Sequence, residues 1–410
     1  MSIKNILIIN QPVGNRGDES AHKALVRSIN KALPDVKITV LAFQDNLNAI
    51  DEFVVQNSNN RYLNFIFKHN LCTEPVALYL IKHRLTKLGT MCHPILRKLR
   101  KYYKNADIVI CAPGGICMGG FQNWKHLYML QVARDLQKPI VYYSRSIGPF
   151  PEATGENKIF KRISLDMLRS FLFLSLRDSK SKRLADSLGI NYVPSIDSAF
   201  LDFPKVAVPD DVKMVLKSPY VVFVPNELTW HYAFKDASQL DVDSMYVSLF
   251  KSIRRVAKEH TILMLPQLCT WKGKDDYTYF QKLAKMIKDD NIVVMPDTTG
   301  SDLQQVIIRG AAFVVGARYH SVVFAINNEV PFVALGYEHK IPGLLEDLSL
   351  ADRVVDITGA FKDSYSCKRV VENFDRVLNQ FYNVKPSRAL ASNIADKCFY
   401  KMLDTIMNVK

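Results

Sequence analysis

Long apolar runs are missing from this sequence. No stretch of 18 or more apolar residues occurs, so we expect no transmembrane helix. The only apolar run near the amino terminus covers residues 6–9 and leads directly into a polar loop, which is not a signal-peptide pattern. The sequence therefore predicts a cytoplasmic protein.

Disulfide and metal-binding patterns are also missing. The seven cysteines are odd in number and scattered, and none of them shows C-x-x-C spacing. There is no H-x-x-x-H pattern and no acidic cluster with the spacing of metal ligands. We therefore expect neither a disulfide framework nor a zinc site, and no metal requirement. The chain also has no internal repeat and no low-complexity tract.

Acidic residues are absent from one region, although the composition is otherwise that of an ordinary globular protein. The net charge is +14, which favours anionic partners. Residues 75–106 contain no acidic side chain, and apolar residues interleave with basic ones at helical spacing, which predicts one or two basic amphipathic helices over residues 76–104. The basic residues of this region are Lys82, Arg84, Lys87, Arg97, Lys98, Arg100, Lys101 and Lys104.

Two interpretations of this basic region remain open. Its apolar side packs on its own domain, or the helices dock on an anionic membrane surface or on a lipid-diphosphate substrate. We expect no nucleic-acid partner, because no recognisable nucleic-acid-binding module is present. The membrane interpretation would make the protein peripheral on the inner face of the cytoplasmic membrane.

The length of 410 residues and the order of the motifs predict two α/β domains. Short apolar strands alternate with helices up to about residue 200, and the alternation restarts after an acidic, proline-marked stretch at 202–211. We expect an N-terminal α/β domain over 1–205, a C-terminal α/β domain over 212–365 and a helical tail over 366–410. The predicted fold is two Rossmann-like parallel-sheet domains facing across a cleft.

The residues with the clearest functional pattern lie between 310 and 347. An apolar strand at 311–315 leads to Arg318 and His320, and a helix is expected from Ser321. Strand-to-helix junctions of open α/β sheets are where ligands bind, and extended spacing would send both side chains to one side. A guanidinium and an imidazole there indicate anion chemistry, whereas the alternative is a structural, hydrogen-bonded histidine.

Three further junctions carry candidate residues. The loop after the first strand contains Asn15, Asp18 and Glu19, which suit hydroxyl binding, although the loop alternatively only caps its helix with Asp18 or Ser20. A glycine-rich loop around Gly115 follows another strand and allows a ligand to approach the backbone. Arg177 follows a strand at 171–176 and is a second anion-binding candidate, with a salt bridge to Asp178 as the alternative.

These segments resemble the polysaccharide pyruvyl transferase family. The resemblance lies in Gly316-Ala317-Arg318-Tyr319-His320 followed by Ala325, Pro331, Tyr337 and Lys340, and in N-x-G-D-E, P-G-G and S-x-G-P segments upstream. It covers residues 5 to 350 as scattered motifs. It implies a fold of glycosyltransferase B type and a transferase acting in the biosynthesis of a surface polysaccharide, such as a capsule or exopolysaccharide.

The resemblance also implies a reaction. The pyruvyl group of phosphoenolpyruvate would be moved onto two hydroxyls of a sugar, giving a cyclic ketal and phosphate without a further cofactor. Arg177, Arg318 and His320 then match the donor-binding and catalytic positions, with Lys340 as an added donor contact. Asn15, Asp18, Glu19 and Gly115 would bind the acceptor, which we expect to be linked to a lipid diphosphate.

A second enzymatic hypothesis remains at this stage. A sugar-nucleotide-dependent glycosyltransferase of polysaccharide biosynthesis would use the same two-domain fold, with Arg318 and Lys340 on the diphosphate. A non-catalytic carbohydrate- or lipid-binding protein is the third possibility, which the presence of the arginines and the histidine opposes.

Overall fold

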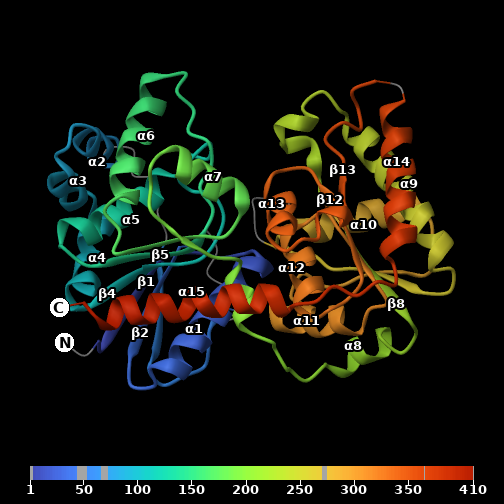
Figure 1. Cartoon of the computed structure of the whole chain (residues 1–410), viewed down its shortest axis with the longest axis horizontal. Coiled ribbons are helices and arrows are strands. Elements are labelled where there is room, and N and C mark those ends of the chain that lie inside the picture. Colours follow the sequence, from blue (N-terminus) through green and yellow to red (C-terminus); the bar gives the residue numbers. More distant parts are fainter. Residues whose placement is uncertain (1–2, 44–52, 66–72, 270–274, 364, 410) are drawn as a thin grey trace. The chain divides into compact units, whose positions relative to one another are not determined.

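The chain forms two compact α/β units in the computed structural model (Figure 1). The first unit contains Met1–Val13, Ala21–Leu201 and Asn393–Lys410, and the second contains Gly14–Ser20 and Asp202–Ser392. The main division falls after residue 201, and chain order does not reveal that Gly14–Ser20 belongs to the second unit. The structure describes residues 3–43, 53–65, 73–269, 275–363 and 365–409.

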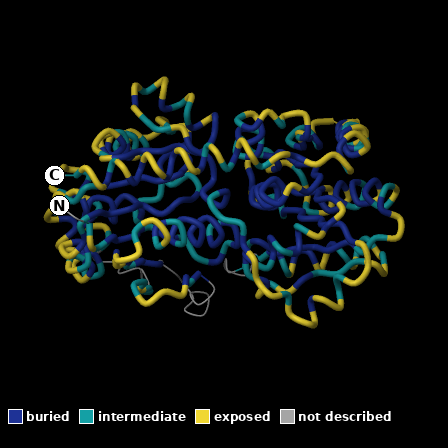
Figure 2. The backbone as a smooth tube through the Cα atoms, turned by 60° about the horizontal axis from the view of Figure 1, so that its bottom comes forward, coloured by how far each residue is buried: buried dark blue, intermediate teal, exposed yellow. Residues whose placement is uncertain are grey.

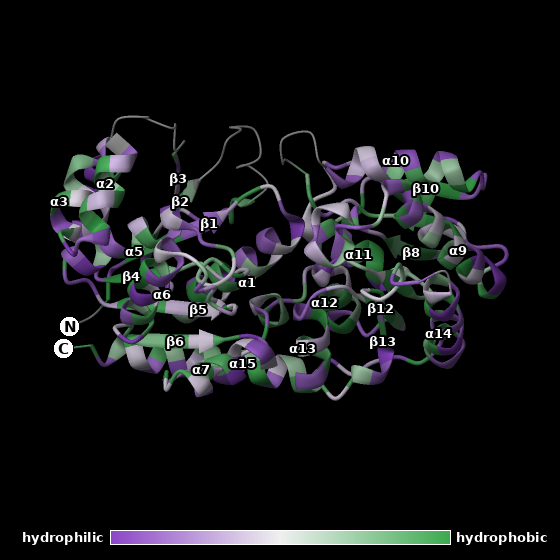
Figure 3. Cartoon of the chain, turned by 90° about the horizontal axis from the view of Figure 1, so that it is seen from above, coloured by the Kyte–Doolittle hydropathy of each residue, from purple (hydrophilic) through white to green (hydrophobic). Residues whose placement is uncertain are grey.

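The first unit is built on a seven-stranded parallel sheet of order β3-β2-β1-β4-β5-β6-β7. Its inner strands are continuous apolar runs, because a parallel sheet is covered on both faces. Figure 3 shows the apolar character of β6. The strands are β1 (Asn5–Pro12), β2 (Lys37–Phe43), β3 (Asn60–Phe65), β4 (Ile108–Cys111), β5 (Ile140–Arg145), β6 (Phe173–Leu176) and β7 (Val193–Pro194).

Helices cover both faces of this sheet. Helix α1 from residue 21 onward and helix α15 contribute buried apolar side chains to the core on one face, and α2, α4, α5, α6 and α7 contribute to the core on the other. Figure 2 shows the contrast between the buried interior and the exposed outer turns. The helices are α1 (Arg16–Ala32), α2 (Thr73–Lys82), α3 (Thr86–Cys92), α4 (Pro94–Asn105), α5 (Trp124–Asp135), α6 (Gly155–Leu168), α7 (Ser179–Ser187) and α15 (Ala389–Met407).

The second unit repeats the plan with a six-stranded parallel sheet of order β10-β9-β8-β11-β12-β13. Its strands are β8 (Tyr220–Val224), β9 (Thr261–Met264), β10 (Ile292–Val294), β11 (Val314–Gly316), β12 (Phe332–Gly336) and β13 (Val354–Asp356). Its helices are α8 (Asp210–Val215), α9 (Gln239–Val256), α10 (Asp276–Ile287), α11 (Ser301–Gly310), α12 (Tyr319–Asn327), α13 (Lys340–Asp347) and α14 (Ser366–Phe381).

Both sheets have the doubly wound order, in which the first strand lies centrally and the order of the strands reverses beside it. The reversal falls between β1 and β4 in the first unit and between β8 and β11 in the second. In such sheets ligands bind beyond the carboxyl ends of the two strands at this point. The predicted class of two Rossmann-like parallel-sheet units is thus confirmed.

Several element boundaries differ from the sequence predictions. Strand β11 begins at Val314 rather than at 311, and the basic region forms three short helices, α2, α3 and α4, instead of one or two. The tail forms two helices, of which α14 belongs to the second unit and α15 from Asn393 onward to the first. Within the described residues, no helix is both long and apolar enough to cross a membrane.

Candidate active site

The candidate site of the second unit lies where the strand order of its sheet reverses, between β8 and β11. Strand β11 ends at Gly316 and leads to Arg318, and the adjacent β8 leads to Asn226. The two strands pair in parallel, with Gly316 opposite Val224, so their carboxyl ends meet at one edge of the sheet. The sequence prediction that Arg318 follows a strand at this edge is confirmed.

Arg318 is held by a buried carboxylate. Its Nη2 forms an ion pair with Asp276, whose side chain is 2% exposed, whereas that of Arg318 is 15% exposed. The other oxygen of Asp276 accepts hydrogen bonds from the backbone N–H groups of Gln267 (3.0 Å) and Leu268 (2.9 Å). These two backbone hydrogen bonds therefore fix the Asp276 carboxylate independently of its pair with Arg318.

The charge on Arg318 is maintained despite its surroundings. Burial would lower the pKa of this guanidinium, but the negative charge of Asp276, with Tyr337 and Tyr246 nearby, raises the pKa above its usual value. Within the described part of the chain, Arg318 Nε has no hydrogen-bond partner. A permanently charged arginine with an unused donor is suited to bind a carboxylate or phosphate.

His320 is buried in the first turn of α12 and is 7% exposed. Gly17 lies against its imidazole so closely that a Cβ at this glycine would be 1.7 Å from His320 Nδ1. Two predictions about this segment are wrong: α12 starts at Tyr319 rather than Ser321, and Arg318 and His320 do not share an extended run. The reason is that Arg318 occupies the N-cap position, where its carbonyl accepts bonds from the Ser321 N–H and hydroxyl.

The segment Gly14–Ser20 is anchored to the second unit through several contacts. Glu19 is fully buried, and its carboxylate accepts hydrogen bonds from the N–H (3.0 Å) and hydroxyl (2.9 Å) of Ser301 at the start of α11. The N-terminus of a helix favours a negative charge at this position. Arg16 pairs with Glu19 at 2.9 Å and donates to the carbonyl of Asp297.

Asn15, rather than Asp18 or Ser20, caps helix α1. Its Oδ1 accepts hydrogen bonds from the N–H groups of Gly17 (2.8 Å) and Asp18 (3.4 Å), so the alternative interpretation of this loop as a helix cap applies to Asn15. Through these contacts, Asn15 and Glu19 shape and fix the segment that contains Gly17. Their assignment to the acceptor stays a prediction, as does that of Asp18.

Lys340 lies after the neighbouring strand β12 and pairs with Glu338 at 2.8 Å. Burial opposes ionisation of Glu338, yet the charge of Lys340 lowers the pKa of this carboxyl below its usual value. The side chains of Lys340 and Glu338 are 24% and 18% exposed, so both reach solvent. Lys340 thus has a local partner, and its contact with the donor stays a prediction.

Aromatic side chains gather beside this pair. The ring of Tyr337 lies 6.1 Å from that of Trp230 and 5.4 Å from that of His231, all in edge-on geometry. Trp230 ends a 3₁₀ turn (Leu228–Trp230) and is 50% exposed, and Tyr232 begins the next turn (Tyr232–Phe234) and is 80% exposed. Flat, exposed rings next to a carboxylate are suited to bind a sugar, with the rings against its C–H faces and the carboxylate on its hydroxyls.

Two predicted site residues lie in the first unit instead. Arg177 is 2% exposed and forms an ion pair with Asp197, and its Nε donates to the Ser146 hydroxyl at 3.2 Å. The expected alternative, a salt bridge to Asp178, is not what the structure shows, because Asp178 caps α7 by accepting the Ser181 N–H at 2.8 Å.

Gly115 belongs to the loop after β4. Its carbonyl accepts a hydrogen bond from Nη2 of the buried Arg145 at 3.1 Å. Gly114 has φ of +156°, and a Cβ there would lie 3.2 Å from the same guanidinium, so this loop is shaped around Arg145. The structure therefore brings together Arg318, His320 and the loop at Asn15, and it places Arg177 and Gly115 in the other unit.

Sequence reasoning missed the residues that support Arg318 and His320. Asp276 does not directly follow a strand and belongs to no recognised motif, so only the folded chain reveals its contact with Arg318. Gly17 and Arg16 lie inside the recognised amino-terminal motif, and the glycine was a usable signal, because a glycine in a loop often marks a place where another group approaches the backbone closely.

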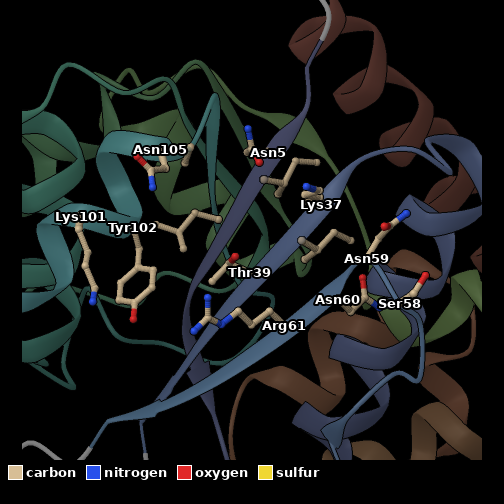
Figure 4. A pocket seen from close by; sticks show the side chains of 14 residues that line it. Asn5, Lys37, Thr39, Ser58, Asn59, Asn60, Arg61, Lys101, Tyr102 and Asn105 are labelled. Atoms are coloured by element: carbon tan, nitrogen blue, oxygen red, sulfur yellow. The ribbon is translucent and has the colours of Figure 1, made fainter.

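A cavity of about 470 Å³ lies elsewhere in the first unit, at the amino ends of β1 and β2. Figure 4 shows Lys37, Arg61 and Lys101 among its lining residues, together with Tyr102 and several asparagines. None of the predicted site residues lines it. It is therefore a separate feature from the site at Arg318.

No group of three or more His, Cys, Asp or Glu residues within the described ranges could hold a metal ion. The sequence does contain one D-x-D, formed by Asp241 and Asp243 in the first half of α9. Both carboxylates are engaged by protein groups: Asp241 accepts from the N–H and hydroxyl of Ser238, and Asp243 accepts from Tyr279 and Lys282.

Comparison with solved structures identifies the fold class. A putative UDP-N-acetylglucosamine 2-epimerase from Listeria monocytogenes has a TM-score of 0.57 at 10% identity, over 100% of this chain and 98% of that one. The UDP-GlcNAc 2-epimerase of Methanocaldococcus jannaschii has a TM-score of 0.56 at 12% identity, over 97% and 100%. The α,α-trehalose 6-phosphate synthase of Burkholderia multivorans has 0.56 at 11%, over 99% and 98%. These likenesses confirm a glycosyltransferase B-like fold.

Comparison of sequences identifies the family. The chain is 22% identical over 422 residues to the amylovoran biosynthesis protein AmsJ of Erwinia amylovora, covering 96% of this chain and 98% of the relative. The model of the polysaccharide pyruvyl transferase family matches residues 15–339, which include the loop at Asn15 and the Arg318–His320 segment. With that match over most of its length, the chain belongs to the polysaccharide pyruvyl transferase family.

Proposed function

We propose that this protein transfers the pyruvyl group of phosphoenolpyruvate onto two hydroxyls of one sugar in a surface-polysaccharide precursor. The observation that carries the proposal is the placement of Arg318 and His320 at the carboxyl ends of β11 and β8, inside the segment matched by the family. The polysaccharide context is supported by the likeness to a protein of amylovoran biosynthesis.

The reaction makes three demands on the protein: the anionic donor must be held, its methylene carbon must gain a proton, and each attacking sugar hydroxyl must lose one. The methylene carbon of the donor gains a proton and becomes a methyl group, so the neighbouring carbon, which bears the phosphate oxygen, becomes electrophilic and two sugar oxygens bond to it in turn. The bond from that carbon to the phosphate oxygen breaks and phosphate leaves. Of the two protons lost by the sugar hydroxyls, one balances the new methyl group and the other leaves with phosphate, so no redox cofactor is needed.

Arg318 would meet the first demand by binding the anionic donor. Its Nη2 is committed to Asp276, whereas its Nε has no hydrogen-bond partner among the described residues and would donate to the anion. A charge-assisted bond of this kind contributes about 1.5 to 3 kcal/mol. His320 would supply the proton, because an imidazole placed at the site is a common general acid in enzymes.

The acceptor would lie on the aromatic side of the same edge. Trp230 and Tyr232 expose their rings, and Trp230 lies edge-on to Tyr337, the chain neighbour of Glu338, whose carboxylate would take a hydrogen bond from a sugar hydroxyl. Asp18, Asn15, Glu19 and Gly115 remain the acceptor residues predicted from the family motif, and Arg177 and Lys340 the added donor contacts. We further propose that the acceptor sugar is carried on a lipid diphosphate.

The decisive experiment incubates the purified protein with phosphoenolpyruvate and cell-derived glycan intermediates, and measures phosphate release together with the mass of the product. We expect acceptor-dependent phosphate release and a ketal product. Arg318→Ala and His320→Ala should each lower turnover more than tenfold, which is above about 1.4 kcal/mol of transition-state stabilisation. The exposed Arg376 provides a control, Arg376→Ala, which should retain activity.

Two results would contradict the proposal. One is turnover within tenfold of wild type in both site variants. The other is nucleotide release from a sugar nucleotide with no use of phosphoenolpyruvate, which would identify a glycosyltransferase instead.

A further inference from the structure

Helices α2 and α3 form a hairpin in the first unit that packs more closely than ordinary side chains allow. Gly89 of α3 faces α2, and a Cβ at this position would lie 2.8 Å from the carbonyl oxygen of Ala77 and 2.8 Å from Ile81 Cγ1. Both Ala77 and Ile81 are buried. The small residues therefore fix the two helices against each other.

The inner side of the basic region joins the core of its own unit. Ile81 from α2 and Leu96, Leu99 and Tyr103 from α4 belong to one buried cluster with helices α5 and α6. Tyr103 also donates a hydrogen bond to the carbonyl of Met129 at 3.0 Å. The packing alternative raised from the sequence thus accounts for this face.

The outer side of the hairpin has apolar residues that this packing does not explain. Five large apolar side chains are exposed within sixteen residues: Val76 (50%), Tyr79 (61%), Leu85 (49%), Leu88 (53%) and Met91 (43%). They recur at helical spacing along α2 and α3 and in the turn between them. Scattered single apolar residues on a surface are ordinary, but a gathering of this kind marks an interaction site.

Basic residues accompany these apolar side chains. Part of the positive charge of the region is used within the unit, since Lys82 pairs with Glu156 and Arg100 lies 4.0 Å from Asp135. Arg84 and Lys87 are exposed, and no carboxylate of the described residues lies within ion-pair distance of either. Residues 75–106 provide no acidic side chain to neutralise them.

We propose that this surface, formed by Val76, Tyr79, Arg84, Leu85, Lys87, Leu88 and Met91, docks on an anionic phospholipid bilayer. Helices of ten and seven residues are too short to cross a bilayer but can lie in the headgroup region. The apolar side chains enter the acyl boundary, and Arg84 and Lys87 contact lipid phosphates. Apolar and cationic groups exposed on the same hairpin match a bilayer better than either group alone, which is why lipid is favoured over a protein partner.

The test is co-sedimentation of the full chain with two kinds of vesicle. One contains phosphatidylcholine alone and is neutral, and the other contains about 30 mol% phosphatidylglycerol and is anionic. We expect binding to the anionic vesicles and at least tenfold weaker binding to the neutral ones. Tyr79→Ser with Leu88→Ser removes apolar contacts, and Arg84→Gln with Lys87→Gln removes two charges. Each pair should weaken binding about tenfold or more.

Matched controls separate this surface from general stickiness. Tyr400 (60% exposed) and Leu390 (44% exposed) lie on α15, so Tyr400→Ser with Leu390→Ser should bind vesicles as wild type does. Thermal unfolding of each variant should show that the fold is retained, because the exchanged side chains are exposed. Pyruvyl transfer to a water-soluble acceptor should be unchanged in all of them, so this test is independent of the proposed reaction.

Three outcomes would overturn the inference. One is the absence of binding to anionic vesicles, and another is equal loss of binding in the control variant. The third is self-association in size-exclusion chromatography that Tyr79→Ser with Leu88→Ser abolishes without any vesicle binding, which would make the surface a protein interface.

Discussion

Gly17 and His320 are separated by about three hundred residues in the chain and lie in direct contact in the second unit. The absence of a side chain at Gly17 leaves the space that the imidazole fills, since a Cβ would stand 1.7 Å from His320 Nδ1. The glycine of the amino-terminal motif thus positions the histidine of the carboxy-terminal motif.

Gly17→Ala should displace the imidazole and lower turnover by about a hundredfold, because misplacement of a reacting group by about 1 Å has effects of this size. We expect a loss of stability of about 1 to 3 kcal/mol from overpacking. Steady-state kinetics and chemical denaturation measure the two effects. Gly155→Ala is the control, since a Cβ at Gly155 meets nothing within 4 Å. Normal turnover in Gly17→Ala would rule out a catalytic His320 in this position.

Asp276→Asn should weaken binding of phosphoenolpyruvate. One oxygen of Asp276 holds the backbone of residues 267 and 268 and the other holds Arg318, so the amide nitrogen of asparagine would face a guanidinium. We expect kcat/KM for the donor to fall by about ten- to a hundredfold, corresponding to a charge-assisted bond of about 1.5 to 3 kcal/mol. The exposed Asp236 supplies the control, Asp236→Asn. An unchanged donor KM would show that Asp276 does not position Arg318.

Trp230→Ala and Tyr232→Ala should affect the acceptor selectively. Removal of an exposed ring that stacks on a sugar should raise the acceptor KM by about tenfold, roughly the contribution of an aromatic contact. The KM for phosphoenolpyruvate should change less than twofold. Tyr365 is 69% exposed in the same unit, and Tyr365→Ala should alter neither constant. Parallel rises in both constants would argue against an acceptor role.

Arg177→Ala should destabilise the protein, because it leaves the buried Asp197 carboxylate without its cation. The expected loss is about 3 to 5 kcal/mol, measured by chemical denaturation. Lys213→Ala, which breaks an exposed pair with Asp210, should have little effect. A donor role for Arg177 predicts in addition that Arg177→Lys raises the KM for phosphoenolpyruvate, and an unchanged KM would leave only the structural role.

His22 should make the protein less stable in mild acid. Burial, with a smaller contribution from the charge of Lys23, lowers the pKa of His22 to about 3, and its Nε2 lies 3.0 Å from the Tyr62 hydroxyl. Below the ordinary histidine pKa of about 6.5 the unfolded chain binds a proton that the folded chain refuses, so stability falls as pH drops from about 6.5 toward 3. The loss is about 1.4 kcal/mol per pH unit, or about 2 kcal/mol at pH 5.

Denaturation at pH 7 and pH 5 measures this dependence, and His22→Gln should reduce the difference between the two values. The exposed His83 gives the matched control, His83→Gln, in which the difference should persist. An equal pH dependence in wild type and His22→Gln would show that His22 does not contribute.

The amino-acid sequence determined the class of the protein, because the signals for it are local. Apolar strands alternating with helices and the break near residue 202 indicated two parallel-sheet units, and Arg318 followed its strand as expected. The start of α12 was misplaced, since the N-cap role of Arg318 depends on backbone geometry that an apolar pattern does not encode.

Only the tertiary structure decided which of these residues meet. Gly17 contacts His320 and Asp276 contacts Arg318, although about three hundred residues separate the first pair in the chain and 42 residues the second. It also assigned Arg177 to a buried pair with Asp197, twenty residues away, rather than to its sequence neighbour Asp178. Pairing between distant side chains depends on the three-dimensional path of the backbone, which no short stretch of sequence contains.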